Sequence, residues 1–211
     1  MRLPWMWKPW LSWPPEWGPA SPADPTAPTS SSPAGKGDMT TPLPEPGELG
    51  VEGHAQMSRL FLEHAGVYLS QGDRIQASEK VWGAAAHALK SIGEQRGWIH
   101  GNHSNIYDIG GQLGREFGQE AQFLDYLSQA QAMHNNFYEN IRDIPAIQRA
   151  LSTVAQFVDE LDVIRNSPPC PYTIQDEEDR IRLGHLLGLR RGERPPIGDH
   201  SQVGYSQTHQ A

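Results

Sequence analysis

Residues 72–89, GDRIQASEKVWGAAAHAL, begin like a helix and keep a helical period to their end. Asp73 follows a turn glycine, and its side chain can accept a hydrogen bond from a free amide of the first helical turn. The residues that recur three and four positions apart are Ile75, Ser78, Glu79, Trp82, Ala85, Ala86, Leu89 and Ile92. This stripe predicts a helix that packs against other helices and carries an ionisable group, Glu79, on its packed face.

Similar patterns on both sides of this helix predict further helices. A first helix begins near His54 and ends at Gly72, with a stripe formed by Met57, Leu60, Phe61, His64, Val67 and Tyr68. Asn102 or Ser104 can cap a third helix, in which Gly110, Gly111 and Gly114 favour close packing against a neighbour. The first two helices, joined by a short break, are expected to form an antiparallel hairpin.

Two more helical patterns complete the predicted core. The stripe of the fourth comprises Phe123, Leu127, Ala130, His134, Phe137 and Ile141. Asp143 caps the fifth, with Pro145 in its first turn, and Ile144, Ile147, Leu151, Val154, Val158, Leu161 and Ile164 follow in three-four alternation. The predicted fold is therefore all-α, an antiparallel up-and-down bundle of about five helices.

Composition divides the chain into three parts. Residues 1–53 are rich in tryptophan and proline and are expected to be a disordered extension. The helical bundle is assigned to residues 54–166, and a proline-rich tail to residues 167–211. Within the tail, residues 174–189 are expected to form a short helix capped by Thr173.

The totals restrict the classes of function. The net charge of -8 argues against a broad basic surface for a phosphate backbone. The only cysteine, Cys170, leaves no Cys-rich metal motif, and no sequence motif for a cofactor is present. No apolar run is long enough for a membrane-spanning helix, and prolines interrupt the apolar N-terminal segment. We therefore expect a cytoplasmic protein with no membrane span, no metal site and no cofactor.

Several polar residues are candidates for a functional site. Cleavage of RNA needs an acid-base imidazole and a cation, which His103 or His134 and Arg96 can supply. A binding site for a ligand would take its contacts from Glu79, Lys80, His87, Lys90, Asn136 and Tyr138. Two alternatives compete with these interpretations. His87 and His134 can instead form structural hydrogen bonds to Glu79, and histidines of this set, including His100, can act as metal ligands.

Two blocks of the sequence, QASEKVWGAAAHALK and MHNNFYE, resemble the PaREP family of small helical proteins, which is related to the HEPN domains. The likeness covers roughly residues 54–166. It implies a HEPN-like bundle that is usually a homodimer. Many HEPN proteins are metal-independent endoribonucleases in which four to six residues separate an arginine from a following histidine, and others bind nucleotides or pair with a nucleotidyltransferase in toxin-antitoxin operons.

The chain departs from the catalytic HEPN pattern. Arg96 and His103 have the permitted spacing, but they lie in a predicted loop and not on a late helix. Where the late-helix motif is expected, His134 has no arginine ahead of it at that spacing. The first hypothesis is therefore a non-catalytic module that binds RNA, a nucleotide or a partner protein. The alternatives are an endoribonuclease that uses Arg96 with His103 or His134, and a purely structural interaction domain.

Overall fold

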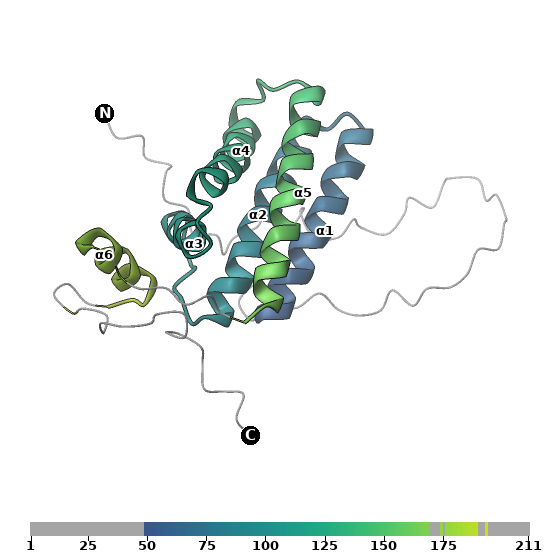
Figure 1. Ribbon diagram of the computed structural model, residues 1–211. Helices are drawn as coiled ribbons and strands as arrows, with labels where there is room; N and C mark the ends of the chain where they lie inside the picture. Colours follow the sequence, from purple (N-terminus) through teal and green to yellow (C-terminus); the bar gives the residue numbers. More distant parts are fainter. Residues whose placement is uncertain (1–48, 169–173, 175, 190–192, 194–211) are drawn as a thin grey trace, which may run out of the picture. The chain divides into compact units, whose positions relative to one another are not determined.

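The computed structural model describes residues 49–168, 174, 176–189 and 193. Within these residues the chain forms helices and no strands, which confirms the predicted all-α class (Figure 1). The helices are α1 (Val51–Ser70), α2 (Arg74–Gln95), α3 (His103–Glu116), α4 (Glu120–Glu139), α5 (Ile144–Asn166) and α6 (Glu177–Leu186). None of them is long and apolar enough to cross a membrane. Most of the tryptophan-rich extension, and Thr173, lie outside the described residues.

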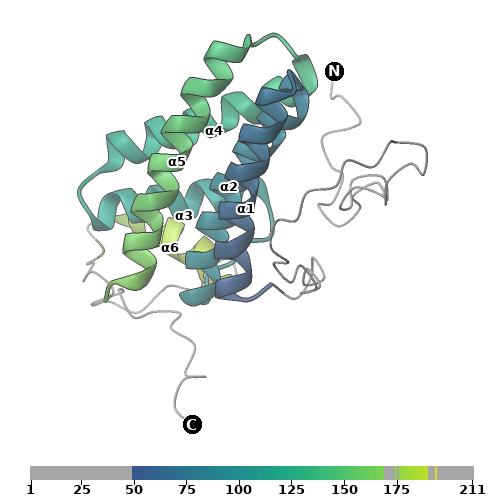
Figure 2. The same cartoon turned by 90° about the vertical axis from the view of Figure 1, so that its right-hand side faces the viewer.

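Helix α2 lies in the middle of the bundle and packs against α1, α3, α4 and α5 (Figure 1 and Figure 2). It is buried on most sides, with Trp82, Leu89 and Ile92 in the core. Small residues allow this close packing. A Cβ atom added to Gly83 would lie 2.5 Å from the Phe61 ring of α1. The predicted single stripe thus underestimates the burial of α2, because a central helix needs apolar or small residues all around.

The helix boundaries follow the capping residues expected from the sequence. The Asp73 carboxylate accepts a hydrogen bond from the Gln76 amide at 3.0 Å, and Asp143 accepts one from Ala146 at 2.9 Å. Asn102 caps α3 by accepting from the Asn105 amide at 3.0 Å. Each bond satisfies an amide that has no partner within its helix. The predicted beginnings of α2, α3 and α5 are therefore confirmed.

The glycines of α3 bring it close to α4. A Cβ atom on Gly110 would lie 2.8 Å from a methyl carbon of Leu127, and one on Gly114 would lie 3.1 Å from the Glu120 Cα atom. The space between the two helices has no room for these extra carbons. The interpretation of these two glycines as packing residues is confirmed, whereas Gly111 meets nothing within 4 Å.

The expected buried stripe is wrong in three places. On α2, Ile75 is 37% exposed. On α1, His64 and Val67 are exposed, because the helix turns His54, Ala55, Ser58, Phe61, Ala65 and Leu69 toward the core. The small residues let α1 approach α2, and the Ser58 hydroxyl donates to the Ala84 carbonyl at 2.8 Å. On α4, Ile141 lies beyond the helix end and is exposed, because Asn140 adopts a left-handed conformation with φ of 50°.

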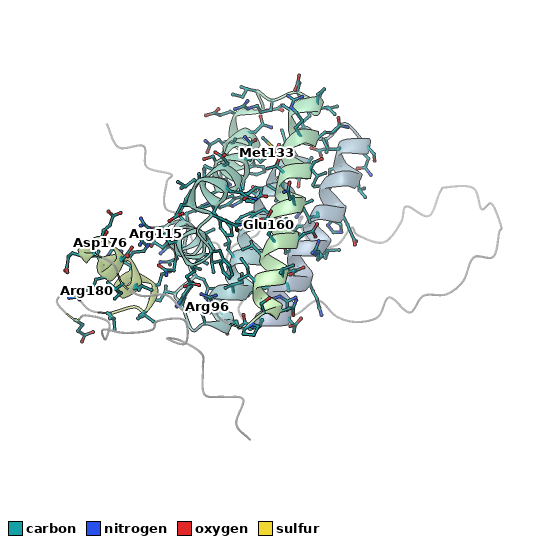
Figure 3. All side chains as sticks on the ribbon, viewed as in Figure 1. Arg96, Arg115, Met133, Glu160, Asp176 and Arg180 are labelled. Carbon is teal, nitrogen blue, oxygen red and sulfur yellow. The ribbon has the colours of Figure 1, made fainter. Side chains whose placement is uncertain are left out.

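Helix α6 is shorter than predicted and packs against α3. Asp176 caps it by accepting a hydrogen bond from the Asp179 amide. Its leucines Leu183 and Leu186 are buried. Arg115 of α3 faces α6 and lies 3.5 Å from the Asp179 carboxylate (Figure 3). Arg182 of α6 is the closer partner of the same carboxylate, so Asp179 is paired both within α6 and with α3.

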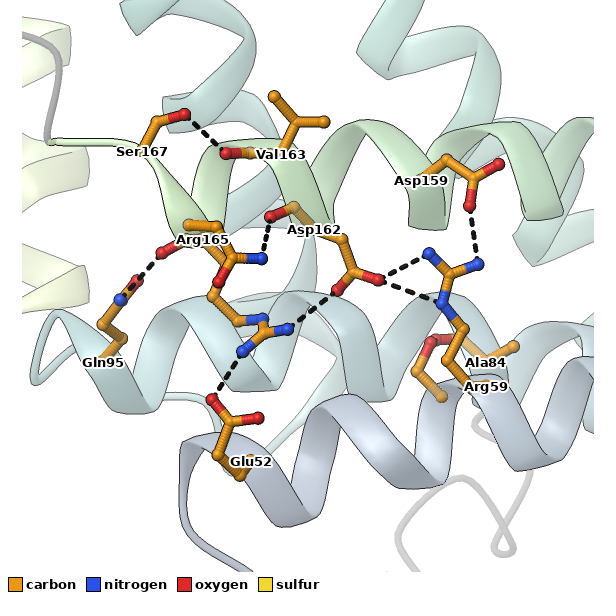
Figure 4. Close-up of polar contacts among 11 residues, drawn as sticks. Glu52, Arg59, Ala84, Gln95, Asp159, Asp162, Val163, Arg165 and Ser167 are labelled. Carbon is orange, nitrogen blue, oxygen red and sulfur yellow. Dashed lines mark hydrogen bonds and ion pairs between the residues drawn. The ribbon is translucent and has the colours of Figure 1, made fainter.

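Ion pairs join α1 to α5 along the outside of the bundle (Figure 4). Arg59 bonds Asp159 at 2.6 Å and Asp162 at 2.5 Å, while Arg165 bonds Glu52 at 2.7 Å. Most of these groups are partly or largely exposed. Exposed pairs contribute little, on the order of 0.2–1 kcal/mol each. They fix the register of the two helices more than they stabilise the core.

Candidate functional site

One side of α2 carries most of its ionisable groups. At 3.6 residues per turn, Glu79, Lys80, His87 and Lys90 fall within a sector of about 100° around the helix axis. Five of the nine histidines of the chain gather along this side in two groups of side chains, and these are His54, His87, His100, His103 and His134. We call the two groups the His103–His134 cluster and the His54–His87 cluster.

The His103–His134 cluster brings together side chains from α2, α3 and α4. The His103 ring stacks on Trp82 with ring centroids 5.1 Å apart and planes inclined by 17°. The His134 ring lies 5.2 Å from Trp82 and 4.8 Å from His103. Trp82 is fully buried, and its indole nitrogen has no hydrogen-bond partner among the described residues. The structure therefore places both histidines against the largest side chain of α2.

Glu79 and Tyr138 complete the His103–His134 cluster. A Glu79 carboxylate oxygen lies 3.6 Å from Nδ1 of His134, and both side chains are 14% exposed. The Tyr138 ring packs edge-on against His134 at 5.2 Å and is 65% exposed. Burial, followed by the negative charge of Glu79, raises the pKa of Tyr138. The cluster thus presents an exposed aromatic ring beside a carboxylate and two imidazoles.

The electrostatics of His103 favour its neutral form. Burial lowers the pKa of His103 to about 4, with smaller contributions from His134 and Lys90. At neutral pH the ring therefore has one nitrogen with a lone pair, which can accept a proton or a hydrogen bond. The neutral His103 ring lies beside His134, which faces the Glu79 carboxylate. This arrangement is suited either to binding polar ligands or to acid-base chemistry.

The His54–His87 cluster lies where α1 meets α2. The Nδ1 atoms of His54 and His87 are 2.9 Å apart, and the His100 ring meets His54 edge-on at 5.7 Å. Lys80 lies 4.4 Å from the centre of the Phe61 ring, which also packs against His87. The Nδ1 contact requires one imidazole to donate and the other to accept, so a single proton lies between the two rings.

Burial is the main cause of the low pKa values in the His54–His87 cluster. It lowers the pKa of His54 to about 4, with further contributions from Lys90 and His100. It lowers the pKa of His87 to about 3, assisted by His54, Lys90 and Lys80. Burial also lowers the pKa of both lysines. The positive charge of Lys90 therefore acts on imidazoles of both clusters.

The end of the His54–His87 cluster is formed by His100. Its Nδ1 atom lies 2.8 Å from the Trp98 carbonyl oxygen, and its Nε2 atom lies 3.3 Å from a Glu94 carboxylate oxygen. Among the described residues, no group of three or more histidine, cysteine, aspartate or glutamate side chains is arranged to hold a metal ion. The polar contacts of His100 are those to the Trp98 carbonyl and the Glu94 carboxylate.

Two of the predicted site residues lie in other contacts. Arg96 is buried, donates to the Glu116 carboxylate at 2.5 Å and lies over the Trp98 ring. Asn136 is buried, donates to the Ser78 hydroxyl at 2.8 Å and accepts from the Arg142 amide at 2.7 Å. These bonds hold α2 to α3 and α4, whereas Glu79, His103, His134 and Tyr138 meet in one cluster.

His54 was not among the predicted site residues. A usable signal was nonetheless present in the hairpin. In an antiparallel pair, residues at equal distance from the turn lie opposite each other, and His54 and His87 lie 17 and 16 residues from Gln71. The same register places Ser58 opposite Ala84, which are hydrogen bonded. Applying this register would have paired the two histidines.

The fold and the clusters together define a small all-helical protein with half-buried histidines along one side of its central helix. The model of the archaeal PaREP1/PaREP8 family matches residues 54–158, and the chain belongs to that family. The matched region contains every residue of the two clusters and ends before α6. No curated protein and no solved structure matches the chain.

Proposed function

We propose that this protein is a non-catalytic, HEPN-like module of the cytoplasm that binds a nucleotide or an unpaired RNA base at the His103–His134 cluster. The observation that carries the proposal is the exposed Tyr138 ring, packed on His134 next to the Glu79 carboxylate. The resemblance to HEPN modules favours a homodimer, with a nucleotidyltransferase as protein partner.

The chemistry of the cluster suits a nucleobase. Unpaired bases stack on tyrosine and histidine rings, and this stacking contributes about 1–3 kcal/mol per base. A carboxylate oxygen accepts hydrogen bonds from the amino group of a base such as cytosine. The chain has a net charge of -8, which gives little general affinity for a nucleic-acid backbone. A single base, held by stacking and by Glu79, therefore fits better than a duplex.

Uncharged nucleosides provide a direct test of the proposed base contacts. We expect cytidine, adenosine or guanosine to bind the full-length protein in calorimetric titrations, and Tyr138→Ala to weaken this binding roughly tenfold or more. Glu79→Gln should weaken binding of amino-bearing nucleosides more than that of uridine. Leu124→Ala, an exposed residue of α4, and Glu63→Gln, an exposed residue of α1, are matched controls.

Two outcomes would contradict base binding. One is that no nucleoside or nucleotide binds, or that Tyr138→Ala binds as well as the wild type. The other is that Glu79→Gln lowers the melting temperature without changing any binding. The second result would mean that Glu79 only stabilises His134 and that the protein is a purely structural interaction domain.

A metal-independent endoribonuclease is the second candidate function. His103 and His134 lie 4.8 Å apart, and two adjacent imidazoles can act as base and acid when a 2′-hydroxyl attacks phosphorus. The cation named for this mechanism, Arg96, lies in a buried salt bridge with Glu116. We rank binding above cleavage for this reason, since a guanidinium in that bond is not directed at a scissile phosphate.

Labelled single-stranded RNA, incubated with the protein in the presence of EDTA, tests the enzymatic candidate. We expect the RNA to remain intact with the wild type. Cleavage that is lost in both His103→Ala and His134→Ala, but kept in His64→Ala, would overturn the non-catalytic proposal. His64 is the matched control because it is an exposed histidine of α1.

A further inference from the structure

We propose that the His54–His87 cluster, together with Lys90, binds a phosphate group. The neighbouring His103–His134 cluster is the proposed base site, so the assignment of this phosphate to a nucleotide rests on the proposed function. The anion site itself depends only on the geometry of the imidazoles and lysines. It can therefore be tested without any base.

The first argument is the gathering of basic groups. His54 comes from α1, Lys80, His87 and Lys90 come from α2, and His100 comes from the following loop. Lys80 and Lys90 are the two lysines of the described residues, and both lie on this side of α2. An anion placed here would offset charges that are partly removed from water, where electrostatic interactions are stronger than in solvent.

The second argument is the surrounding charge. Lys90 acts on His54, His87 and His103, and Lys80 acts on His87. The nearby carboxylates are Glu79, which faces His134 and also acts on Lys80, and Glu94, which faces His100. The charges that lower the pKa values of the two paired imidazoles are therefore those of lysines and histidines. This favours an anion such as phosphate or sulfate over a cation or a neutral ligand.

The third argument is the hydrogen bond between His54 and His87. Because one Nδ1 atom donates to the other at 2.9 Å, the accepting ring carries its hydrogen on Nε2. When the pair takes up one proton, the second ring also carries hydrogen on Nε2. Both rings can then donate to oxygen atoms of an anion, in charge-assisted bonds. Binding of an anion should therefore be coupled to the uptake of about one proton.

The position of Lys90 links this site to the proposed base site. Its charge lowers the pKa of imidazoles in both clusters, His87 and His103. On α2, Lys90 and Glu79 are separated by 11 positions, close to three full turns, so they share one face of the helix about 16 Å apart along its axis. A ligand that reaches both sites must therefore be longer than a nucleoside monophosphate, such as a dinucleotide with a 5′-phosphate.

Inorganic sulfate is the appropriate probe, because it keeps its charge over the whole pH range of interest. We expect calorimetric titration of the full-length protein to show sulfate binding that strengthens roughly fivefold or more from pH 7 to pH 5.5. Titrations in two buffers with different ionisation enthalpies should give an uptake of about one proton. His87→Asn retains an amide for the bond to His54 but cannot itself be protonated, and should lower the proton uptake well below one.

Lys90→Met should weaken sulfate binding at least fivefold. Arg149→Met, which removes an exposed positive charge on α5, and His64→Asn, on the exposed face of α1, should leave it unchanged. Equal weakening by the control variants, or no sulfate binding at any pH, would overturn the anion site. An undiminished uptake of about one proton in His87→Asn would overturn it as well.

Inorganic phosphate, nucleosides and a dinucleotide with and without a 5′-phosphate separate this inference from the proposed function. We expect the 5′-phosphorylated dinucleotide to bind more tightly than the same dinucleotide without this phosphate, with the gain lost in Lys90→Met. Nucleoside binding with no gain from the phosphate would overturn the phosphate site and leave the proposed function standing. Binding of phosphate and sulfate without any nucleoside binding would overturn the proposed function and leave a site for free anions.

Discussion

Glu116→Leu should lower the free energy of unfolding by about 3–5 kcal/mol, the usual cost of leaving one partner of a buried ion pair without the other. The side chains of Arg96 and Glu116 are 3% and 1% exposed, and the nitrogen and oxygen atoms that join them are 2.5 Å apart. Gln112 also donates to the Glu116 carboxylate at 3.1 Å. The variant therefore leaves a buried guanidinium unpaired and removes an acceptor from a buried amide.

Urea unfolding followed by circular dichroism measures this effect. The double variant Arg96→Met/Glu116→Leu should recover most of the loss, because it removes the buried charge together with its partner. Asp159→Asn, in the exposed pair with Arg59, is the control and should cost less than about 1 kcal/mol. If Glu116→Leu lowers the free energy of unfolding as little as Asp159→Asn does, a structural role for the Arg96–Glu116 pair is contradicted.

Arg96 illustrates why a candidate site is harder to predict than a fold. Its spacing to His103 fits a nuclease motif, but spacing along the chain says nothing about the carboxylate that lies 20 residues away on α3. The contact depends on how α3 folds back after the loop that follows α2. The guanidinium of Arg96, at the C-terminal end of α2, could extend into solvent or into the core. Only the packing of α3 places it in the core, beside Glu116.

The helices themselves were largely predictable, because capping residues and apolar periods are local signals. Asp73, Asn102 and Asp143 cap their helices as expected. The buried face of α1 was not predictable from hydrophobicity alone. Ser58 and Ala65 are buried because close contact with α2 needs small residues.

Predicting how the histidines group requires both local sequence signals and the packing of distant helices. His103 and His134 lie on different helices, and their contact follows from the way α3 and α4 both cover Trp82. A stripe on a helical wheel shows that His134 turns inward, but not which side chain it meets. The contact between His54 and His87, in contrast, follows from the register of a single hairpin. Local hairpins are therefore the better basis for predicting such sites.

The paired imidazoles should make the fold sensitive to moderate acid. Burial lowers the pKa of His54 to about 4 and that of His87 to about 3, from 6.5 in the unfolded chain. Below pH 6.5 the unfolded chain therefore binds more protons than the folded one. The stabilisation is complete above pH 6.5 and is lost as the pH falls toward the folded-state values. Between pH 6.5 and pH 5 we expect a loss of about 3 kcal/mol from this pair.

This pH window separates the histidines from the carboxylates, which remain largely ionised above pH 5. Free energies of unfolding from urea titrations at pH 7.5, 6.5, 5.75 and 5 give the slope. His87→Asn should reduce the slope, because one of the two buried imidazoles no longer titrates. His64→Asn should leave the slope as in the wild type, since His64 is exposed on α1. If the two variants have equal slopes, the pairing of His54 with His87 does not govern the acid response, and the proton coupling expected for anion binding loses its basis.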